Sequence, residues 1–222
     1  MVPALDEKVM RSTGRWPIFA AVLAVAALLL ALEPSESPLE GVAVSFAFEP
    51  RVGSYAALDP TLRAYGFAPV RSPYLTAFGV RGRTWLPNGF LIELAMTYGI
   101  GTADASDGGP PTVTTQIDSG VGAGYMAPFG LFATVGVGFG VLTQSVASTS
   151  EGGALVYRAP FVHPRVGYAF TRSAWFGAVS AGFVLHAPVG RAHEQPLWEA
   201  SFERPTIHAF TIGIESGFGW VR

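Results

Sequence analysis

The chain of 222 residues lacks cysteine altogether, which excludes disulfide bonds, a thiol nucleophile and a lipid-modified N-terminal cysteine. It is also poor in charge, because 14% of its residues are charged and the formal net charge at pH 7 is −2. No cluster of lysine or arginine occurs after the N-terminal region, so we expect no nucleic-acid partner. No second long apolar run follows residue 32, so the only candidate for an export or anchor helix is N-terminal.

Motifs of catalysis and ligand binding are absent as well. The four histidines show no HxxxH or HExxH spacing, so no metal site is expected. The glycines of 120–124 and 136–140 alternate strictly and precede no helical pattern, unlike those of a phosphate-binding loop. His163 and His186 have the parity of inward-facing residues and are interpreted as structural. We therefore expect no cofactor and no catalytic residue.

The chain instead repeats one pattern about eight times between Gly41 and Arg222, in which bulky apolar residues alternate with small or polar ones. From Phe90 to Ile100 every second residue is large and apolar, and residues such as Glu93 lie between them. A period of two places the two sets on opposite faces of a strand. With the bulky face outward, the arrangement inverts that of a soluble barrel and is typical of a transmembrane β-barrel. The content of 50% hydrophobic residues, 27 glycines and 16 phenylalanines agrees with this interpretation.

The alternation predicts an all-β fold, a transmembrane up-and-down antiparallel barrel of eight strands over residues 42–222. The strands are expected at 42–52, 74–86, 90–101, 112–127, 131–146, 155–171, 174–189 and 206–220. Long connections (53–73, 102–111, 147–154 and 190–205) alternate with short ones (87–89, 128–130 and 172–173). This alternation of long and short connections is typical of outer-membrane barrels, whose short turns are periplasmic. In the first long loop, Asp59-Pro60 predicts one helical turn over 59–63.

Two short turns fix the register of their hairpins. Pro87-Asn88-Gly89 and Pro128-Phe129-Gly130 each read as a three-residue loop whose glycine adopts the left-handed conformation. Leu86 then pairs with Phe90, and Arg83 lies directly across from Glu93 on the small-residue face.

The same parity predicts a set of charged residues inside the barrel. Four arginines and four carboxylates would balance one another in a lumen that is filled by side chains. This lumen charge network consists of Arg83, Glu93, Arg81, Asp118, Arg165, Glu215, Glu49 and Arg51.

Aromatic residues of the opposite parity gather near the short-turn ends of the strands. There they would form a girdle at the periplasmic membrane interface. The predicted girdle residues are Tyr125, Phe129, Phe170, Trp175, Phe218 and Trp220. The alternative is the aromatic core of a soluble β-sandwich, but strands of twelve or more residues lined by glycine are about twice the typical soluble length.

The N-terminus resembles a secretory signal peptide. Lys8, Arg11 and Arg15 precede an apolar run from Trp16 to Leu32, which a polar stretch ends abruptly. We assign 1–32 to the signal and 33–41 to a periplasmic linker, so the N-terminus is expected in the periplasm after export. An uncleaved helical anchor and a start at Met10 are the alternatives.

This pattern resembles the small eight-stranded outer-membrane barrels of the OmpA/OmpX type over residues 42–222. The resemblance implies a filled interior, insertion in the outer membrane of a Gram-negative-type envelope, and contact with outer-membrane lipids. Such barrels commonly end in an aromatic residue, whereas this chain adds Val221 and Arg222 after Trp220. The expected role is a non-enzymatic structural or surface barrel whose loops contact an extracellular partner, or which meets a periplasmic protein partner.

Two other functions stay open at this point. One is a narrow pore or a channel for hydrophobic molecules. The other is a lipid A-modifying enzyme, an acyltransferase or deacylase, for which His193, Glu194, Ser201 and Glu203 in the last long loop would supply a Ser/His/acid set. Their spacing gives that set no support.

Overall fold

The computed structural model describes residues 41–58, 74–103, 112–146, 154–172, 174–187, 193–194 and 206–221. The described residues form nine β-strands and one short 3-10 helix, η2 (Tyr55–Leu58). The strands are β1 (Gly41–Gly53), β2 (Tyr74–Trp85), β3 (Phe90–Ala103), β4 (Thr112–Met126), β5 (Leu131–Val146), β6 (Ala154–Arg172), β7 (Trp175–His186), β8 (His193–Glu194) and β9 (Ile207–Val221). In this part of the chain, no helix has the length and apolar character needed to cross a bilayer.

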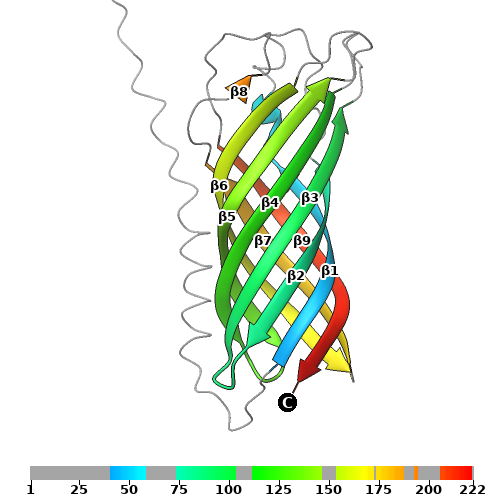
Figure 1. Cartoon of the computed structure of the whole chain (residues 1–222), viewed down its shortest axis with the longest axis vertical. Coiled ribbons are helices and arrows are strands. Elements are labelled where there is room, and N and C mark those ends of the chain that lie inside the picture. Colours follow the sequence, from blue (N-terminus) through cyan, green and yellow to red (C-terminus); the bar gives the residue numbers. More distant parts are fainter. Residues whose placement is uncertain are drawn as a thin grey trace, which may run out of the picture.

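Eight of these strands close into an antiparallel barrel (Figure 1). Each strand pairs with the next along the chain, β7 pairs with β9, and β9 pairs back with β1. Every backbone edge of the barrel wall therefore faces another strand, which is the condition for a sheet to span hydrocarbon. The predicted fold class is confirmed.

The ladders also define how far the strands are staggered. The path of direct partners from Gly41 runs through Trp85, Leu91, Gly124, Thr134, Arg165, Gly182 and Thr211. It returns to β1 at Arg51, ten residues beyond its start. This shear tilts the strands against the barrel axis, as Figure 1 shows, and brings residues that are distant in sequence to one level of the lumen.

Side chains alternate strictly between the lumen and the outer surface. Along β1 the burial pattern switches at each residue, with Ala43, Ser45 and Ala47 buried and Phe46 exposed to 73%. The outer surface is therefore apolar and the polar residues are inside, which is the inverted arrangement that the sequence predicted.

The strand ends differ from the predicted ones by a few residues. Gly41, assigned to the linker, already belongs to β1 because it pairs with Trp85 and Val221. The two-residue strand β8 was not predicted; it lies in the expected loop 190–205 and pairs with Leu155 and Val156 of β6. The signal 1–32, the linker 33–40 and the helical turn at 59–63 lie outside the described residues.

Both hairpin turns have the predicted conformation. Gly89 and Gly130 have φ values of 79° and 96°, in the left-handed region that glycine adopts without steric conflict. The Leu86 N–H donates to the Phe90 carbonyl at 2.8 Å, and the Ala127 N–H donates to the Leu131 carbonyl at 2.7 Å. These bonds fix the register in which Arg83 lies opposite Glu93.

Proline interrupts two of the ladders. The β1–β9 ladder skips Glu49 and Pro50, and the β6–β7 ladder skips His163 and Pro164. Proline has no N–H to donate, so both gaps follow from the sequence. The flanking pairs keep the same register on both sides of each gap.

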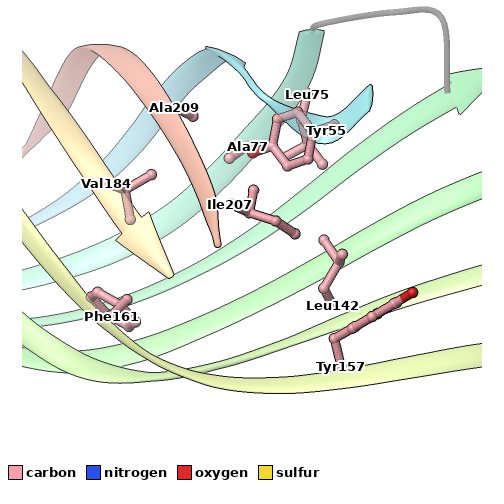
Figure 2. Close-up of a cluster of buried hydrophobic side chains, with 9 residues drawn as sticks. All are labelled: Tyr55, Leu75, Ala77, Leu142, Tyr157, Phe161, Val184, Ile207 and Ala209. Atoms are coloured by element: carbon pink, nitrogen blue, oxygen red, sulfur yellow. The ribbon is translucent and has the colours of Figure 1, made fainter. Parts of the chain in front are cut away.

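The lumen has three layers. At the short-turn end lies an apolar cluster around Trp85, Phe132 and Phe176, which we call the short-turn cluster. At the opposite end lies the long-loop cluster, formed by Tyr55, Leu75, Ala77, Leu142, Tyr157, Phe161, Val184, Ile207 and Ala209 (Figure 2). The buried charged residues come from the strand segments between these two clusters. The charges are thus shielded from both mouths of the barrel.

Candidate functional site

The carboxylate of Glu215, in β9, forms ion pairs with three arginines in the middle of the lumen. Arg81 Nη1 donates to its carboxylate at 2.7 Å, and Arg83 donates through Nη1 and Nη2 at 2.7 and 2.8 Å. Arg165 Nη1 lies 3.7 Å from the same carboxylate. Ser45 Oγ adds a fourth donor at 2.9 Å. Because β9 pairs with neither β2 nor β6, the three arginine contacts cross the lumen and do not run between adjacent strands.

Glu93 of β3 binds one arginine from the adjacent strand β2 and one from β6, which is not adjacent to β3. Arg83 Nε donates to Glu93 Oε2 at 2.7 Å, and Arg165 Nη2 donates to Oε1. The Arg83 guanidinium also lies over the rings of Phe132 and Phe176, with its carbon 5.0 and 5.6 Å from the ring centroids. Cation–π contacts of this kind connect the charged layer to the short-turn cluster.

Glu49 and Asp118 extend the network toward the long-loop end. Arg81 Nη2 donates to Glu49 Oε2, and Arg51 Nε donates to Glu49 Oε1 at 3.1 Å. Arg51 then reaches Asp118 Oδ2 at 2.5 Å and Thr97 Oγ1 at 2.9 Å. Every carboxylate of the network is bound by at least one arginine, as buried charges require.

A chain of polar contacts continues from Asp118 to the mouth. Asp118 Oδ1 lies 2.9 Å from His186 Nε2, and Gln116 Nε2 donates to the Asp118 carboxylate at 3.0 and 3.2 Å. The Tyr55 hydroxyl donates to Gln116 Oε1 at 3.2 Å. Tyr55 lies in η2, just beyond β1, and burial raises the pKa of its phenol to about 12.

The structure brings all eight predicted lumen residues into this one network, and none of them is more than 4% exposed. Sequence reasoning did not assign Ser45, Thr97 and Gln116 to it. The sequence does indicate that they face the lumen, because all three have inward parity on predicted strands. The role of Tyr55 carried no such signal, since it follows the end of a strand.

Among the described residues, the cavities that border the charge network are small. One cavity of about 20 Å³ borders Arg81 and Arg165, and another of about 20 Å³ borders Gln116 and His186. Each is large enough for about one water molecule. A wider space of about 260 Å³ lies at the short-turn end, against Trp85, Phe129 and Phe176. The charged layer therefore holds the barrel closed rather than lining a passage.

Five of the six predicted girdle residues are exposed, and the sixth is covered by its neighbours. Phe129, Phe170, Trp175, Phe218 and Trp220 are all exposed on the outer surface near the short turns. Tyr125 is predicted with them, but the residue is only 7% exposed. It lies over the backbone of Gly89 in the neighbouring turn and packs with Ala127 and Ala133, so it does not belong to the exposed girdle.

Other chemistry has little support in the described residues. Among them, no group of three or more His, Cys, Asp or Glu residues is placed to hold a metal ion. His193 and Glu194 form β8, whereas Ser201 and Glu203 lie outside the described residues. One serine–histidine contact occurs at the rim, where Ser54 Oγ is 3.0 Å from His208 Nδ1. Because Ser54 Oγ also accepts the His208 N–H at 3.0 Å, this contact fastens the end of β1 to β9.

Fold and network together define a closed eight-stranded antiparallel β-barrel with a buried charge network in its lumen and large apolar residues on its outer surface. The structure resembles Ail, the attachment invasion locus protein of Yersinia pestis, with a TM-score of 0.50, 7% sequence identity, and coverage of 83% of this chain and 99% of Ail. Ail in complex with the heparin analogue sucrose octasulfate gives a TM-score of 0.52 at 7% identity, with coverage of 82% and 99%. The N-terminal β-barrel domain of Pseudomonas aeruginosa OprF gives 0.42 at 14% identity, with coverage of 81% and 97%.

The likeness to Ail confirms the predicted resemblance to small eight-stranded outer-membrane barrels at the level of the fold. No protein-family model matches the chain. No curated protein matches its sequence.

Proposed function

We propose that this protein is a non-enzymatic outer-membrane barrel with a sealed lumen, which serves a structural or surface-interaction role. Its working surface would be formed by the loops 53–73, 102–111, 147–154 and 190–205 at one end. The N-terminus and the short turns would lie in the periplasm. Its partners would be outer-membrane lipids and a protein that meets the loops or the periplasmic face.

One observation carries this proposal: the lumen is closed by three successive layers of side chains. A passage for solutes would need a continuous polar path, but Glu215, Glu93 and Asp118 are each tied to arginines that come from different strands. Apolar clusters cover the network on both sides. Opening such a lumen would expose or separate several buried ion pairs at once, at a cost of several kcal/mol for each.

The outer surface supports membrane insertion. Large apolar residues are exposed along every barrel strand, for example Leu94 and Met96 in β3 and Ile212 and Ile214 in β9. The exposed aromatic residues near the short turns match an interfacial girdle, with Trp175 Nε1 donating to Ser216 Oγ at 3.0 Å. A soluble protein rarely exposes an apolar surface that runs around its whole body.

Membrane fractionation tests the location. The protein is expected to remain with outer membranes through carbonate washing and to migrate differently on a gel before and after boiling, because a closed barrel resists unfolding by detergent. Release into the soluble periplasm would refute membrane insertion and favour the soluble sandwich.

Planar-bilayer recording tests the sealed lumen. The purified protein, shown to be folded by its heat-dependent gel migration, should give no large stepwise conductance. Regular conductance steps would refute the sealed lumen and support the narrow pore, and uptake of apolar solutes would support a hydrophobic channel. A change in lipid A mass that depends on the protein would support the enzyme instead.

A further inference from the structure

A small cavity in the lumen is bordered both by residues of the charge network and by glycines of β4 and β5. Its volume is about 20 Å³. Its lining includes Arg81, Arg165, Glu93 and Asp118 of the network, and also Gly120 and Gly136. The inward glycines of the wall thus leave room that a side chain would otherwise fill.

Two guanidinium groups that line this cavity keep an unused donor. Among the described residues, neither Arg81 Nε nor Arg165 Nη1 has a hydrogen-bond partner, although both atoms are buried. The two terminal nitrogens of Arg81 bind Glu49 and Glu215, and Arg165 Nη2 binds Glu93. Arg165 Nη1 lies 3.7 Å from the Glu215 carboxylate, beyond hydrogen-bond distance. A buried N–H of a charged group left without an acceptor is strongly unfavourable, so an acceptor in the cavity is expected.

We propose that this cavity is a binding site for one ordered water molecule, which accepts from Arg81 Nε and Arg165 Nη1 and donates to the Glu93 or Asp118 carboxylate. The volume suits one water, and the site offers the two to four polar partners that a buried water needs. A small anion would also accept from the arginines. It would, however, lie against two carboxylates in a network whose four arginines and four carboxylates already balance.

The wall supplies a matched pair of positions to test this. A Cβ built on Gly136 meets only ordinary contacts, the nearest at 3.6 Å to the His163 carbonyl oxygen. A Cβ on Gly122 likewise meets nothing closer than 3.4 Å, and Gly122 is the direct cross-strand partner of Gly136. Only Gly136 of the two lines the cavity. A methyl group is therefore tolerated sterically at both positions but intrudes on the water at one.

The experiment compares Gly136→Ala, Gly136→Ser and Gly122→Ala by equilibrium urea unfolding in detergent micelles. Gly136→Ala should lower the folding equilibrium constant by about tenfold, because the displaced water leaves a buried donor unpaired. Gly136→Ser should recover much of that loss, because its hydroxyl replaces the water as acceptor and donor. Gly122→Ala should not destabilise the barrel, since alanine is favoured over glycine inside a strand.

A crystal structure at high resolution, with a second crystal soaked in bromide, completes the test. Density for one water in the unmodified protein, lost in Gly136→Ala, is the expected result. Equal effects of alanine at 136 and 122 would overturn the site, as would failure of serine to differ from alanine at 136. An anomalous bromide signal in the cavity would show that the site binds an anion, and would overturn the assignment of water as its ligand.

Discussion

Arg83 and Glu215 form a two-pronged ion pair across the lumen, although they are 132 residues apart in sequence. Both Nη atoms of Arg83 donate to the two oxygens of one carboxylate, at 2.7 and 2.8 Å, while its Nε remains bound to Glu93. Two parallel donors constrain the carboxylate in both position and orientation, which a single contact does not do. Glu215 is therefore the point at which arginines from β2 and β6 are held together.

Removing this carboxylate should weaken the barrel strongly. Glu215→Ala strips partners from three buried arginines, and we expect a loss of about 3 to 5 kcal/mol in the free energy of unfolding. Equilibrium urea unfolding in detergent micelles measures this loss. Ser119→Ala on the exposed outer surface serves as the control and should change stability by no more than about 0.5 kcal/mol. A loss below about 1 kcal/mol for Glu215→Ala would mean that the arginines are hydrated rather than paired.

A double-mutant cycle tests the cross-strand pair itself. Glu93→Ala should cost about 3 kcal/mol, because it removes a buried carboxylate partner from both Arg83 and Arg165. Arg83→Ala should cost less in that background than in the unmodified protein, with a coupling energy of about 1 to 3 kcal/mol. The second loss should not vanish, because Arg83 also binds Glu215. Strictly additive losses would show that Arg83 and Glu93 do not interact.

The left-handed glycine of the second hairpin should be irreplaceable. A Cβ on Gly130 would lie 2.1 Å from the Ala169 carbonyl oxygen at a φ of 96°, so Gly130→Ala should destabilise by more than about 1 kcal/mol. A Cβ on Gly82 would meet nothing within 4 Å, and the φ of Gly82 is not positive, so Gly82→Ala should be tolerated. The fraction of folded protein on an unboiled gel distinguishes the two. Equal behaviour of both variants would contradict the three-residue turn.

Single cysteines can establish which end of the barrel faces outward, because the chain has none of its own. Ala57→Cys in η2 lies exposed at the long-loop end, and Asn88→Cys lies exposed in a short turn. A membrane-impermeant thiol reagent on intact cells should label position 57 and leave 88 unlabelled until the cells are opened. Labelling of 88 on intact cells would reverse the proposed orientation.

Much of the wall was predictable because it depends on local rules. A period of two assigns each side chain to a face, and a Pro-x-Gly turn fixes how two strands meet. Together these placed Arg83 across from Glu93 in the register that the structure has. They also indicated which charged residues face inward, since parity needs no knowledge of the partner strands.

The contacts across the lumen were not predictable in the same way. Arg83 meets Glu215, and Arg51 meets Asp118, only because of the stagger accumulated around the whole barrel. Tyr125 was misassigned because parity reports the face of a residue and not whether a neighbouring turn covers it. The contact of Tyr55 with Gln116 and the pairing of β8 with β6 involve residues outside the barrel strands, where the sequence has no periodic pattern.

The ten-residue offset on return to β1 limits how the strands can change in length. Because ten is even, a side chain that starts inside is still inside after one complete circuit. Deleting a single residue in the middle of β2 would reverse the facing of every residue on one side of the deletion, unless a bulge absorbed the change. Either Arg81 and Arg83 or the inward residues of the other half of β2 would then point to the outer surface. Natural variants of this protein should therefore gain or lose strand residues in pairs, whereas single insertions and deletions should accumulate in the long connections.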